Sequence, residues 1–378
     1  MADSMTHRER VMRAVSHQEP DRVPMDLGSH VNSSIHSFAY QKLKAALGVD
    51  VDKPTGLVSK MMQDVAVQDN VLNVLDIDAR GVFHGSCKSQ KDDGYEWIDE
   101  WGVARIKPQG AYYYDMVRAP LAGQITVQDI ANYPWPPLDD PAIVRELREQ
   151  VKHWRATTDC AIVLNVPSAF VHQSQYMRGF EDWFMDLAAD PKLAAALIDA
   201  ILDIRMAWGA QILDAVGQDV DIILTSDDMG TQTGLQFSPR TYRQLLKPRH
   251  AKYWDMIHSK TNAPVMLHSC GSIYEIMPDF IDMGIQIINP VQTHAVNMQP
   301  EKLKKEFGAH LTFWGGVDIQ EVMPFGSPED VRNEVRYLFE TLGKGGGWVL
   351  CPAHNLQPEI PPENIIALYQ AGRELCRY

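Results

Sequence analysis

The residues best suited to chemistry are one histidine and two cysteines that follow short apolar runs. His268 and Cys270 come at the end of the run 265–267, and Cys351 ends a second run, 348–350. Side chains alternate between the two faces of a strand, so His268 and Cys270 are expected to project from the same face. Imidazole and thiolate are zinc ligands, and a catalytic zinc has three protein ligands and an open fourth position. The spacing therefore predicts a zinc site, with a packed histidine and buried cysteines as the alternative.

Polar residues also follow the other apolar runs and are candidates for catalysis or binding. The set comprises Asn165, Asp227, Asp228, Asn289, Gln292, Asp318 and His354. Asp227 and Asp228 could move protons or orient a substrate, although a carboxylate in this position also caps helices. The same two interpretations apply to Asp318. His354 could be a fourth ligand, a hydrogen-bond partner of a ligand or a substrate contact, and we expect a role other than ligand.

The strands and helices that must position these residues alternate regularly along the sequence. Short apolar runs lie near residues 22, 77, 161, 221, 264, 285, 311 and 347, separated for the most part by segments with helical periodicity. Such alternation is typical of parallel βαβ units, and eight of them predict an α/β fold of the (β/α)8 TIM-barrel type. Strand ends then meet at one rim, where His268 and Cys351 can come together. A doubly wound open sheet is the alternative, but no strand is followed by a Gly-x-Gly-x-x-Gly turn.

The rest of the chain is expected to belong to the same domain, which spans residues 1–378. Thr6 and Glu9 have the spacing of a capping box and predict an N-terminal helix over 6–17. Helical periodicity continues at 35–48 and 59–75. Between about 84 and 120, tyrosines and tryptophans stand among polar residues, which predicts a β-hairpin insertion or lid.

Composition and charge exclude several classes of protein. The chain has 378 residues and a net charge of −14, which argues against a nucleic-acid partner and against binding to an anionic membrane. Its five cysteines are widely spaced and do not indicate a disulfide framework. Neither a signal-peptide core nor an apolar run long enough to span a bilayer is found, so we expect a cytoplasmic protein without a membrane anchor.

Several segments of the chain together form a recognisable pattern, namely residues 6–10, 20–24, 227–232, 268–271, 289–292, 313–318 and 352–355. These segments are similar to those of the uroporphyrinogen decarboxylase-like superfamily. The resemblance covers essentially the whole chain and implies a (β/α)8 barrel. The decarboxylases of this superfamily carry an N-terminal Arg-Gln-Ala-Gly-Arg-Tyr stretch that holds substrate carboxylates, whereas this chain reads Val-Pro-Met-Asp-Leu-Gly at 23–28.

The second branch of the superfamily resembles this chain more closely. It comprises corrinoid-dependent methyltransferases, including the methylcobamide:coenzyme M type, whose zinc motif is His-x-Cys followed far downstream by Cys. That motif maps onto His268, Cys270 and Cys351. The resemblance implies a Zn2+-dependent methyltransferase that moves a methyl group between a corrinoid of the cobalamin type and a thiol, a folate or a methoxy- or methylamine-type small molecule. A decarboxylase and a non-enzymatic barrel with structural zinc are the alternatives.

In the implied mechanism, a zinc-bound thiolate attacks a methyl group on the corrinoid. The expected catalytic residues are Asp227, Asp228 and His354, and the expected contacts to the substrate or the corrinoid are Asn165, Asn289, Gln292 and Asp318. The corrinoid is expected on a separate protein, because the chain has no cobalamin-binding Asp-x-His-x-x-Gly segment. Aromatic residues of the insertion could contact that protein. Whether the chain forms a homodimer is left open.

Overall fold

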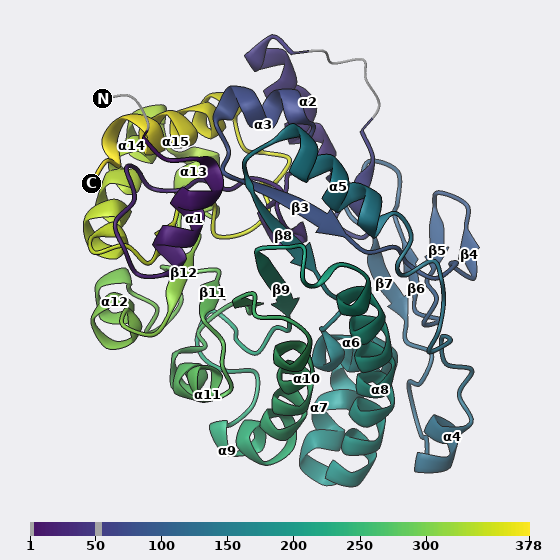
Figure 1. Cartoon of the computed structure of the whole chain (residues 1–378). Coiled ribbons are helices and arrows are strands. Elements are labelled where there is room, and N and C mark those ends of the chain that lie inside the picture. Colours follow the sequence, from purple (N-terminus) through teal and green to yellow (C-terminus); the bar gives the residue numbers. More distant parts are fainter. Residues whose placement is uncertain (1–3, 50–54) are drawn as a thin grey trace.

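A computed structural model describes residues 4–49 and 55–378 of the chain. Its centre is a seven-stranded parallel sheet that curls into a barrel, with the strand order β13-β12-β11-β10-β9-β8-β3 (Figure 1). The strands are β3 (Ala79–Phe83), β8 (Ala161–Asn165), β9 (Ile222–Ser226), β10 (Val265–His268), β11 (Ile287–Asn289), β12 (Thr312–Trp314) and β13 (Trp348–Val349). Each strand lies where the sequence has an apolar run.

The eighth position of the barrel is filled by residues 23–27, which lie between β13 and β3. The backbone N–H of Asp26 donates to the carbonyl of Leu350 at 2.9 Å, and that of Asp78 donates to the carbonyl of Met25 at 2.9 Å. Met25 and Leu350 also form a parallel bridge. The predicted (β/α)8 barrel is thus confirmed, with its first strand held by isolated bonds rather than by a full ladder.

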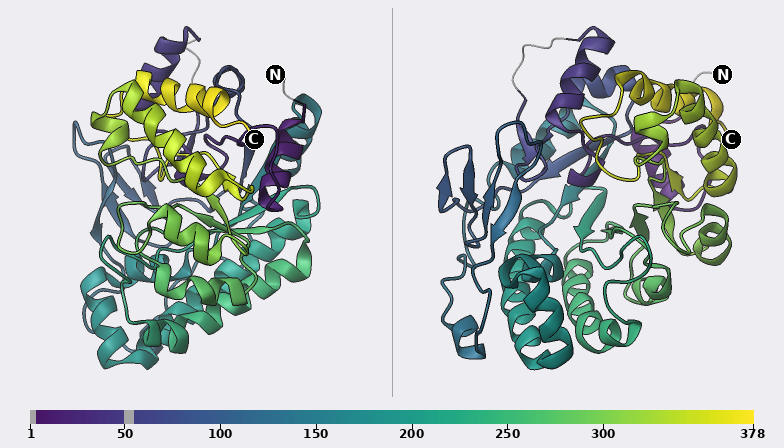
Figure 2. Two further views of the ribbon diagram at one scale, coloured as in Figure 1. Left: turned by 90° about the vertical axis from the view of Figure 1, so that its left-hand side faces the viewer. Right: turned by 180° about the vertical axis from the view of Figure 1, so that it is seen from behind.

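Helices surround the barrel and cover the outer faces of its strands (Figures 1 and 2). The longer ones are α1 (His7–Val15), α2 (Ser37–Leu47), α5 (Leu147–Thr157), α6 (Phe170–Arg178), α7 (Phe180–Ala189), α8 (Pro191–Val216), α10 (Lys247–Lys260), α12 (Pro300–Phe307), α14 (Pro328–Leu338) and α15 (Pro362–Leu375). The shorter ones are α3 (Asp69–Leu75), α4 (Val127–Ala131), α9 (Pro239–Thr241), α11 (Met277–Asp282) and α13 (Val322–Phe325). Among the described residues, no helix combines the length and the apolar character needed to cross a membrane.

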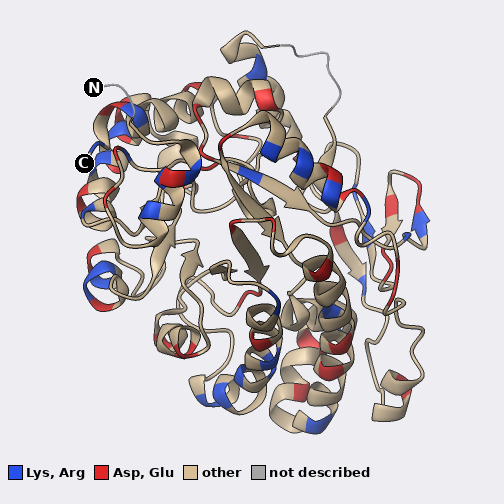
Figure 3. Cartoon of the chain, in the orientation of Figure 1, with Lys and Arg blue, Asp and Glu red and all other residues tan. Residues whose placement is uncertain are grey.

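Positive and negative side chains are mixed over the outer helices (Figure 3). The neighbouring helices α8 and α10 are joined by three ion pairs, namely Arg249 with Asp199 at 2.7 Å, Lys252 with Asp203 at 3.2 Å and Lys260 with Asp214 at 2.6 Å. Exposed pairs of this kind contribute only ~0–1 kcal/mol each. The buried apolar faces of the two helices therefore contribute most to holding them together.

Alternate residues of the strands fill the barrel interior. They include Ala79, Ala161, Val163, Ile222, Leu224, Met266, Ile287, Trp314, Val349 and Cys351. Val11 and Val15 of α1 pack against the same cluster and close the N-terminal end of the barrel. Since the interior is filled by side chains, polar residues at the strand ends are left at the opposite, C-terminal rim.

One buried carboxylate ties the N-terminal helix to the barrel. Asp78 accepts hydrogen bonds from Arg10 at 2.6 Å, from Arg22 at 2.7 Å and from His7 at 2.7 Å, and it also accepts from the backbone N–H of Met25. Burial would raise the pKa of Asp78, but the hydrogen bond from His7 and the charges of Arg22 and Arg10 hold that pKa below its ordinary value. Asp78 and both arginines are almost completely buried, so losing one partner would leave a charge in dry surroundings.

Two segments differ from their predicted elements. The periodicity at 59–75 predicts one helix, but only Asp69–Leu75 is helical, because β1 (Leu57–Ser59) and β2 (Asp64–Val65) form a small antiparallel pair. The tertiary environment favours that pair, since Ser34 Oγ donates to the carbonyl of Val65 at 2.6 Å.

The insertion is larger than the predicted hairpin. Its strands β4 (Lys91–Asp92), β5 (Glu96–Ile98), β6 (Ala104–Ile106) and β7 (Asp115–Arg118) form a four-stranded antiparallel sheet at one side of the barrel (Figure 1).

Candidate metal centre

Strand β10 delivers His268 and Cys270 to the C-terminal rim. His268 is the last residue of the strand and is buried, and Cys270 follows two residues later with its side chain partly buried. Gly271 comes next with φ of +83°, and a Cβ at this position would lie 2.5 to 2.6 Å from the backbone of Gly230 and Thr231. Only glycine allows this approach, so the chain turns directly after Cys270.

The structure brings together His268, Cys270 and His354. One potential ligand atom from each lies within 4.8 Å of the other two. The sulfur of Cys270 is 3.3 Å from Nε2 of His268, and the ring centroids of His268 and His354 are 5.7 Å apart. Two imidazoles and one thiol form a donor set that zinc accepts, and three protein ligands leave a fourth position open for a substrate.

The imidazole of His268 is held in one orientation by Asn289. Nδ1 of His268 is hydrogen-bonded to Oδ1 of Asn289, whose Nδ2 donates to the carbonyl of Trp314 at 2.9 Å. Because the amide NH2 faces a carbonyl, the amide oxygen faces the imidazole and accepts from Nδ1–H. Nε2 is then the unprotonated nitrogen of His268 and is available to a metal.

His354 is held in the same way by Asn355. Nδ1 of His354 is hydrogen-bonded to Oδ1 of Asn355, and Nδ2 of Asn355 donates to both carboxylate oxygens of Asp64 at 2.9 and 3.1 Å. With its NH2 directed to Asp64, the amide turns its oxygen toward the imidazole, as Asn289 does. Both histidines therefore keep Nε2 available for a metal.

Asp228 lies beside the three potential ligands. Its Oδ1 accepts a hydrogen bond from the N–H of Cys270 at 2.9 Å and lies 3.7 Å from Nε2 of His268. Burial lowers the pKa of His268 to about 4, so the ring is neutral at pH 7, as a ligand must be. Burial and the charge of Asp228 raise the pKa of the Cys270 thiol, and a bound cation would oppose both by stabilising the thiolate.

Cys351, the third ligand predicted from the sequence, is not part of this group. Its thiol is buried in the barrel interior, 3.9 Å from Oδ2 of Asp26. The same oxygen accepts a hydrogen bond from Nε1 of Trp314 at 2.9 Å. His354 thus occupies the place expected for Cys351. Metal binding by Cys351 stays a prediction, and it requires the side chain to turn away from Asp26.

Two of the predicted carboxylates cap helices. Asp227 accepts hydrogen bonds from the backbone N–H groups of Val171 at 3.0 Å and His172 at 2.9 Å, at the start of α6. Asp318 accepts from the backbone N–H groups of residues 320–322 at 2.7 to 3.0 Å, just before α13. Both side chains are buried, so the capping interpretation explains their positions. A direct role of either residue in chemistry stays a prediction.

Asn165 and Gln292 hold the backbone of the rim. Nδ2 of Asn165 donates to the carbonyl of Ser29 at 3.0 Å, and Oε1 of Gln292 accepts from the N–H of Gly271 at 2.6 Å. Oδ1 of Asn165 is buried and has no hydrogen-bond partner within the described part of the chain. Gln292 therefore shapes the turn after Cys270, while Asn165 keeps one acceptor for a ligand or water.

His30, which belongs to no motif recognised in the sequence, lies near the same rim. Its side chain is completely buried, and neither ring nitrogen has a hydrogen-bond partner in residues 4–49 and 55–378. Its Nε2 is 3.6 Å from Oδ2 of Asp26, the oxygen that also faces Cys351. Buried polar groups are normally paired, so an unpaired histidine here indicates that a water or a ligand completes the site. The only feature of the sequence that could have indicated a role for His30 at the site is its position directly after the first strand.

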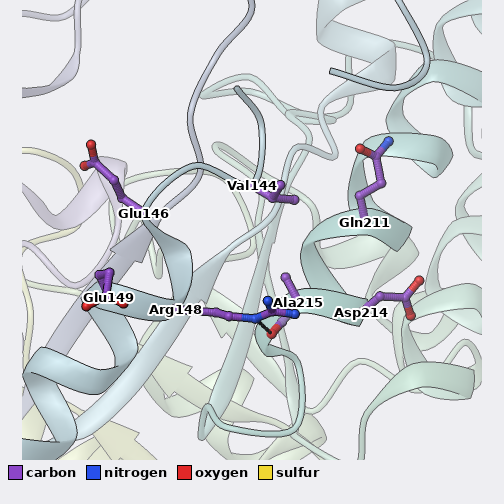
Figure 4. A pocket seen from close by; sticks show the side chains of 7 residues that line it. All are labelled: Val144, Glu146, Arg148, Glu149, Gln211, Asp214 and Ala215. Carbon is purple, nitrogen blue, oxygen red and sulfur yellow. Dashed lines mark hydrogen bonds between the residues drawn. The ribbon is translucent and has the colours of Figure 1, made fainter. Parts of the chain in front are cut away.

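A surface hollow of about 510 Å³ lies away from this centre, between residues at the start of α5 and the C-terminal part of α8 (Figure 4). Its lining consists of Val144, Glu146, Arg148, Glu149, Gln211, Asp214 and Ala215. Nε of Arg148 reaches the carbonyl of Ala215 at 3.3 Å (Figure 4). The hollow contains none of the predicted site residues, and its lining has no thiol, hydroxyl or imidazole side chain.

Residues 122–375 match the protein family described as uroporphyrinogen decarboxylase (URO-D). The chain belongs to this family. The match starts after the insertion and includes strands β8 to β13, and therefore all four candidate metal ligands of the URO-D barrel, His268, Cys270, Cys351 and His354.

The proteins that are similar to this URO-D family chain include both a methyltransferase and a decarboxylase. The methylated-thiol--coenzyme M methyltransferase of Methanosarcina mazei is 26% identical over 199 residues, which are 53% of this chain and 49% of that protein. The uroporphyrinogen decarboxylase of Hydrogenovibrio crunogenus is 24% identical over 182 residues, 47% of this chain and 48% of that protein. The chain thus matches about half the length of these curated relatives.

A solved structure of a methyltransferase from Methanosarcina mazei superposes on nearly the whole chain. The TM-score is 0.68 at 18% identity, covering 98% of this chain and 99% of that one. At this identity the likeness supports the barrel fold.

Proposed function

We propose that this URO-D family protein is a zinc-dependent methyltransferase that moves a methyl group between a corrinoid and a thiol or another small methyl-carrying molecule. The observation that carries the proposal is the group of His268, Cys270 and His354 at the barrel rim, where each imidazole is bonded to an asparagine through Nδ1. Similarity to a methylated-thiol--coenzyme M methyltransferase supports a thiol as one substrate.

The residues present fit a zinc ion. Nitrogen and sulfur donors are the ligands that zinc prefers, and hydrogen bonds at Nδ1 leave Nε2 of both histidines for the metal. His268 and Cys270 would hold zinc together with one ligand from the loop 351–354, which is His354 as the structure stands or Cys351 if its side chain turns away from Asp26. When bound, zinc lowers the pKa of a coordinated thiol, so that a thiolate forms at neutral pH.

The surrounding side chains would orient the substrate and accept its proton. Asp228 has a side chain that is 30% exposed and contacts the N–H of Cys270, so it is reachable by a thiol arriving at the rim and is our candidate proton acceptor. Asp227 would hold the start of α6 in place. His30 and Asn165 would bind polar groups of the substrate, since their buried ring nitrogens and Oδ1 have no partner among the described residues.

The proposed reaction forms a carbon–sulfur bond at the thiol, breaks the bond between the methyl group and the corrinoid, leaves that electron pair on the corrinoid and releases the thiol proton. The corrinoid would be carried by a separate protein, because the sequence has no Asp-x-His-x-x-Gly segment. The four-stranded insertion beside the barrel is the candidate contact surface for that protein.

Metal analysis and a methyl-transfer assay test the proposal. The purified protein should contain about one zinc per chain, Cys270→Ala should lose it, and Cys160→Ala should retain it, because Cys160 is a buried cysteine before β8 at the other end of the barrel. Methylcobalamin should then methylate at least one member of a panel of thiols. Zinc unaffected by Cys270→Ala would remove the site, and carbon dioxide release from a porphyrinogen without methyl transfer would favour a decarboxylase.

A further inference from the structure

Asn355 lies at a junction between the candidate metal centre and two segments outside the core barrel. Its amide NH2 donates to Asp64 of β2, at 2.9 and 3.1 Å. Its amide oxygen accepts from Nε2 of Gln357 at 2.9 Å and is hydrogen-bonded to Nδ1 of His354. Both the oxygen and the NH2 of this completely buried amide therefore have hydrogen-bond partners, and these partners fix its orientation.

Asp64 is a buried carboxylate with an unusually small set of donors. It is 1% exposed, and within residues 4–49 and 55–378 the amide of Asn355 is the only group that donates to its side chain. A buried carboxylate without a charged partner is unfavourable for folding. Its presence opposite Asn355 is explained if it determines which end of the amide faces His354.

The orientation of this amide decides which nitrogen of His354 is free. With its NH2 toward Asp64, the amide offers its oxygen to His354, so Nδ1 carries the proton and Nε2 can bind a metal. A reversed amide would offer NH2 to Nδ1, which would place the proton on Nε2 and block that ligand position. In its ionised form Asp64 excludes the reversed orientation, because a carboxylate facing the amide oxygen would be repelled. Burial raises the pKa of Asp64 to about 7, so the exclusion is complete only above that pH.

The insertion reaches the same amide from the other side. The hydroxyl of Tyr113 donates to Oε1 of Gln357, whose Nε2 is bonded to Asn355. The segment that carries Tyr113 is itself anchored, since Lys107 Nζ donates to Oε1 of Gln63 at 2.6 Å and the N–H of Tyr114 donates to the carbonyl of Met61 at 3.1 Å. A continuous set of hydrogen bonds thus joins the insertion to His354.

We propose that Asp64 and Tyr113 are positioning residues that act through Asn355 to set the tautomer and the reach of His354, and thereby the affinity of the centre for zinc. This inference rests on the proposed function, in that it takes the centre to be a zinc site. It gives the insertion a role in the metal centre itself, so that a partner contacting the insertion can alter metal binding at the rim.

The test is a set of zinc affinities measured by chelator competition on the full-length chain. Asp64→Leu should weaken zinc binding by about 10- to 100-fold, the usual effect of losing an outer hydrogen-bond partner of a ligand. Asp64→Asn should weaken binding less than Asp64→Leu does, because its amide oxygen can accept from Asn355, although its own NH2 can also face a reversed amide. Tyr113→Phe should weaken binding by a smaller factor. The matched control, Tyr337→Phe, removes a hydroxyl that donates to Glu301 on the outer helices and should leave zinc affinity unchanged.

A double-mutant cycle separates positioning from general destabilisation. In a His354→Ala background, Asp64→Leu should cause no further loss of zinc affinity, because the residue through which it acts is gone. Equal losses in both backgrounds would overturn the inference. A wild-type chain that binds no zinc would overturn it together with the proposed function. Zinc binding without methyl transfer would overturn the proposed activity alone, and the cycle would still decide the role of Asp64.

Discussion

His268 and Asn289 stand opposite each other in the register of β10 and β11, and Nδ1 of His268 is hydrogen-bonded to Oδ1 of Asn289. The amide of Asn289 continues to β12, where it donates to the carbonyl of Trp314 at 2.9 Å. Three adjacent strands therefore determine the orientation of one imidazole. The first prediction concerns this arrangement.

Asn289→Leu should weaken zinc binding by about 10- to 100-fold, because His268 loses the acceptor that keeps its proton on Nδ1. The measurement is chelator competition followed by metal analysis. Asn333→Leu, at an exposed position of α14, is the control and should bind zinc as the wild type does. Unchanged affinity in Asn289→Leu would show that the strand register does not control the ligand.

His354→Ala and Cys351→Ala should have different effects on the metal. As the structure stands, Cys270 is the single thiolate of the centre, so a Co2+-loaded protein should keep its sulfur-to-cobalt charge-transfer band in Cys351→Ala. His354→Ala should keep that band but bind Co2+ more weakly, with shifted ligand-field bands. Loss of about half of the charge-transfer intensity in Cys351→Ala would show instead that Cys351 leaves Asp26 and binds the metal, as the sequence predicts.

Removal of the metal should abolish methyl transfer and leave the fold intact. The barrel interior is filled by apolar side chains, and the candidate ligands lie at its rim, so folding does not depend on the ion. Far-ultraviolet circular dichroism before and after chelation should therefore agree, and added zinc should restore activity. Unfolding on chelation would indicate a structural zinc site of the kind that closes with four ligands.

Asp78→Asn should destabilise the protein by about 3–5 kcal/mol, because Arg10 and Arg22 would keep their charges in buried surroundings with a weakened partner. Urea unfolding measures the change. Asp203→Asn removes one partner of an exposed pair with Lys252 and should change the free energy of unfolding by less than about 1 kcal/mol. A similar small change in Asp78→Asn would contradict the role assigned to the buried network.

The same network gives a pH dependence of stability with a defined sign. The pKa of Asp78 is lowered in the folded protein, so its contribution is complete above the pKa of an unfolded aspartate and is lost as the pH falls through the folded value. The hydrogen bond to Asp78 raises the pKa of His7 despite partial burial, so the contribution of His7 is complete below the unfolded histidine pKa and is lost as the pH rises through the folded value. Acid unfolding should therefore be steeper in the wild type than in Asp78→Asn.

Local patterns in the sequence were sufficient to predict the positions of the strands and most of the residues at the C-terminal rim. A short apolar run placed β10, the alternation of side chains along a strand put His268 and Cys270 on one face, and a capping box of Thr6 and Glu9 located the start of α1. These features depend on neighbouring residues, which is why they can be read from the chain alone. The helix predicted at 59–75 failed in its first part, because β2 pairs with β1 and is bonded to Ser34, and no local pattern reveals that contact.

The amino-acid sequence by itself determined an α/β barrel and brought a nitrogen donor of His268 and the sulfur of Cys270 to one strand end. Only the tertiary structure decided that His354, rather than Cys351, faces them, and that Asn289, Asn355 and Asp64 direct the imidazoles. The physical reason is that alternation fixes side-chain direction only within a strand, whereas residues 351–357 form an irregular loop whose path depends on partners nearly 300 residues away in sequence, such as Asp64.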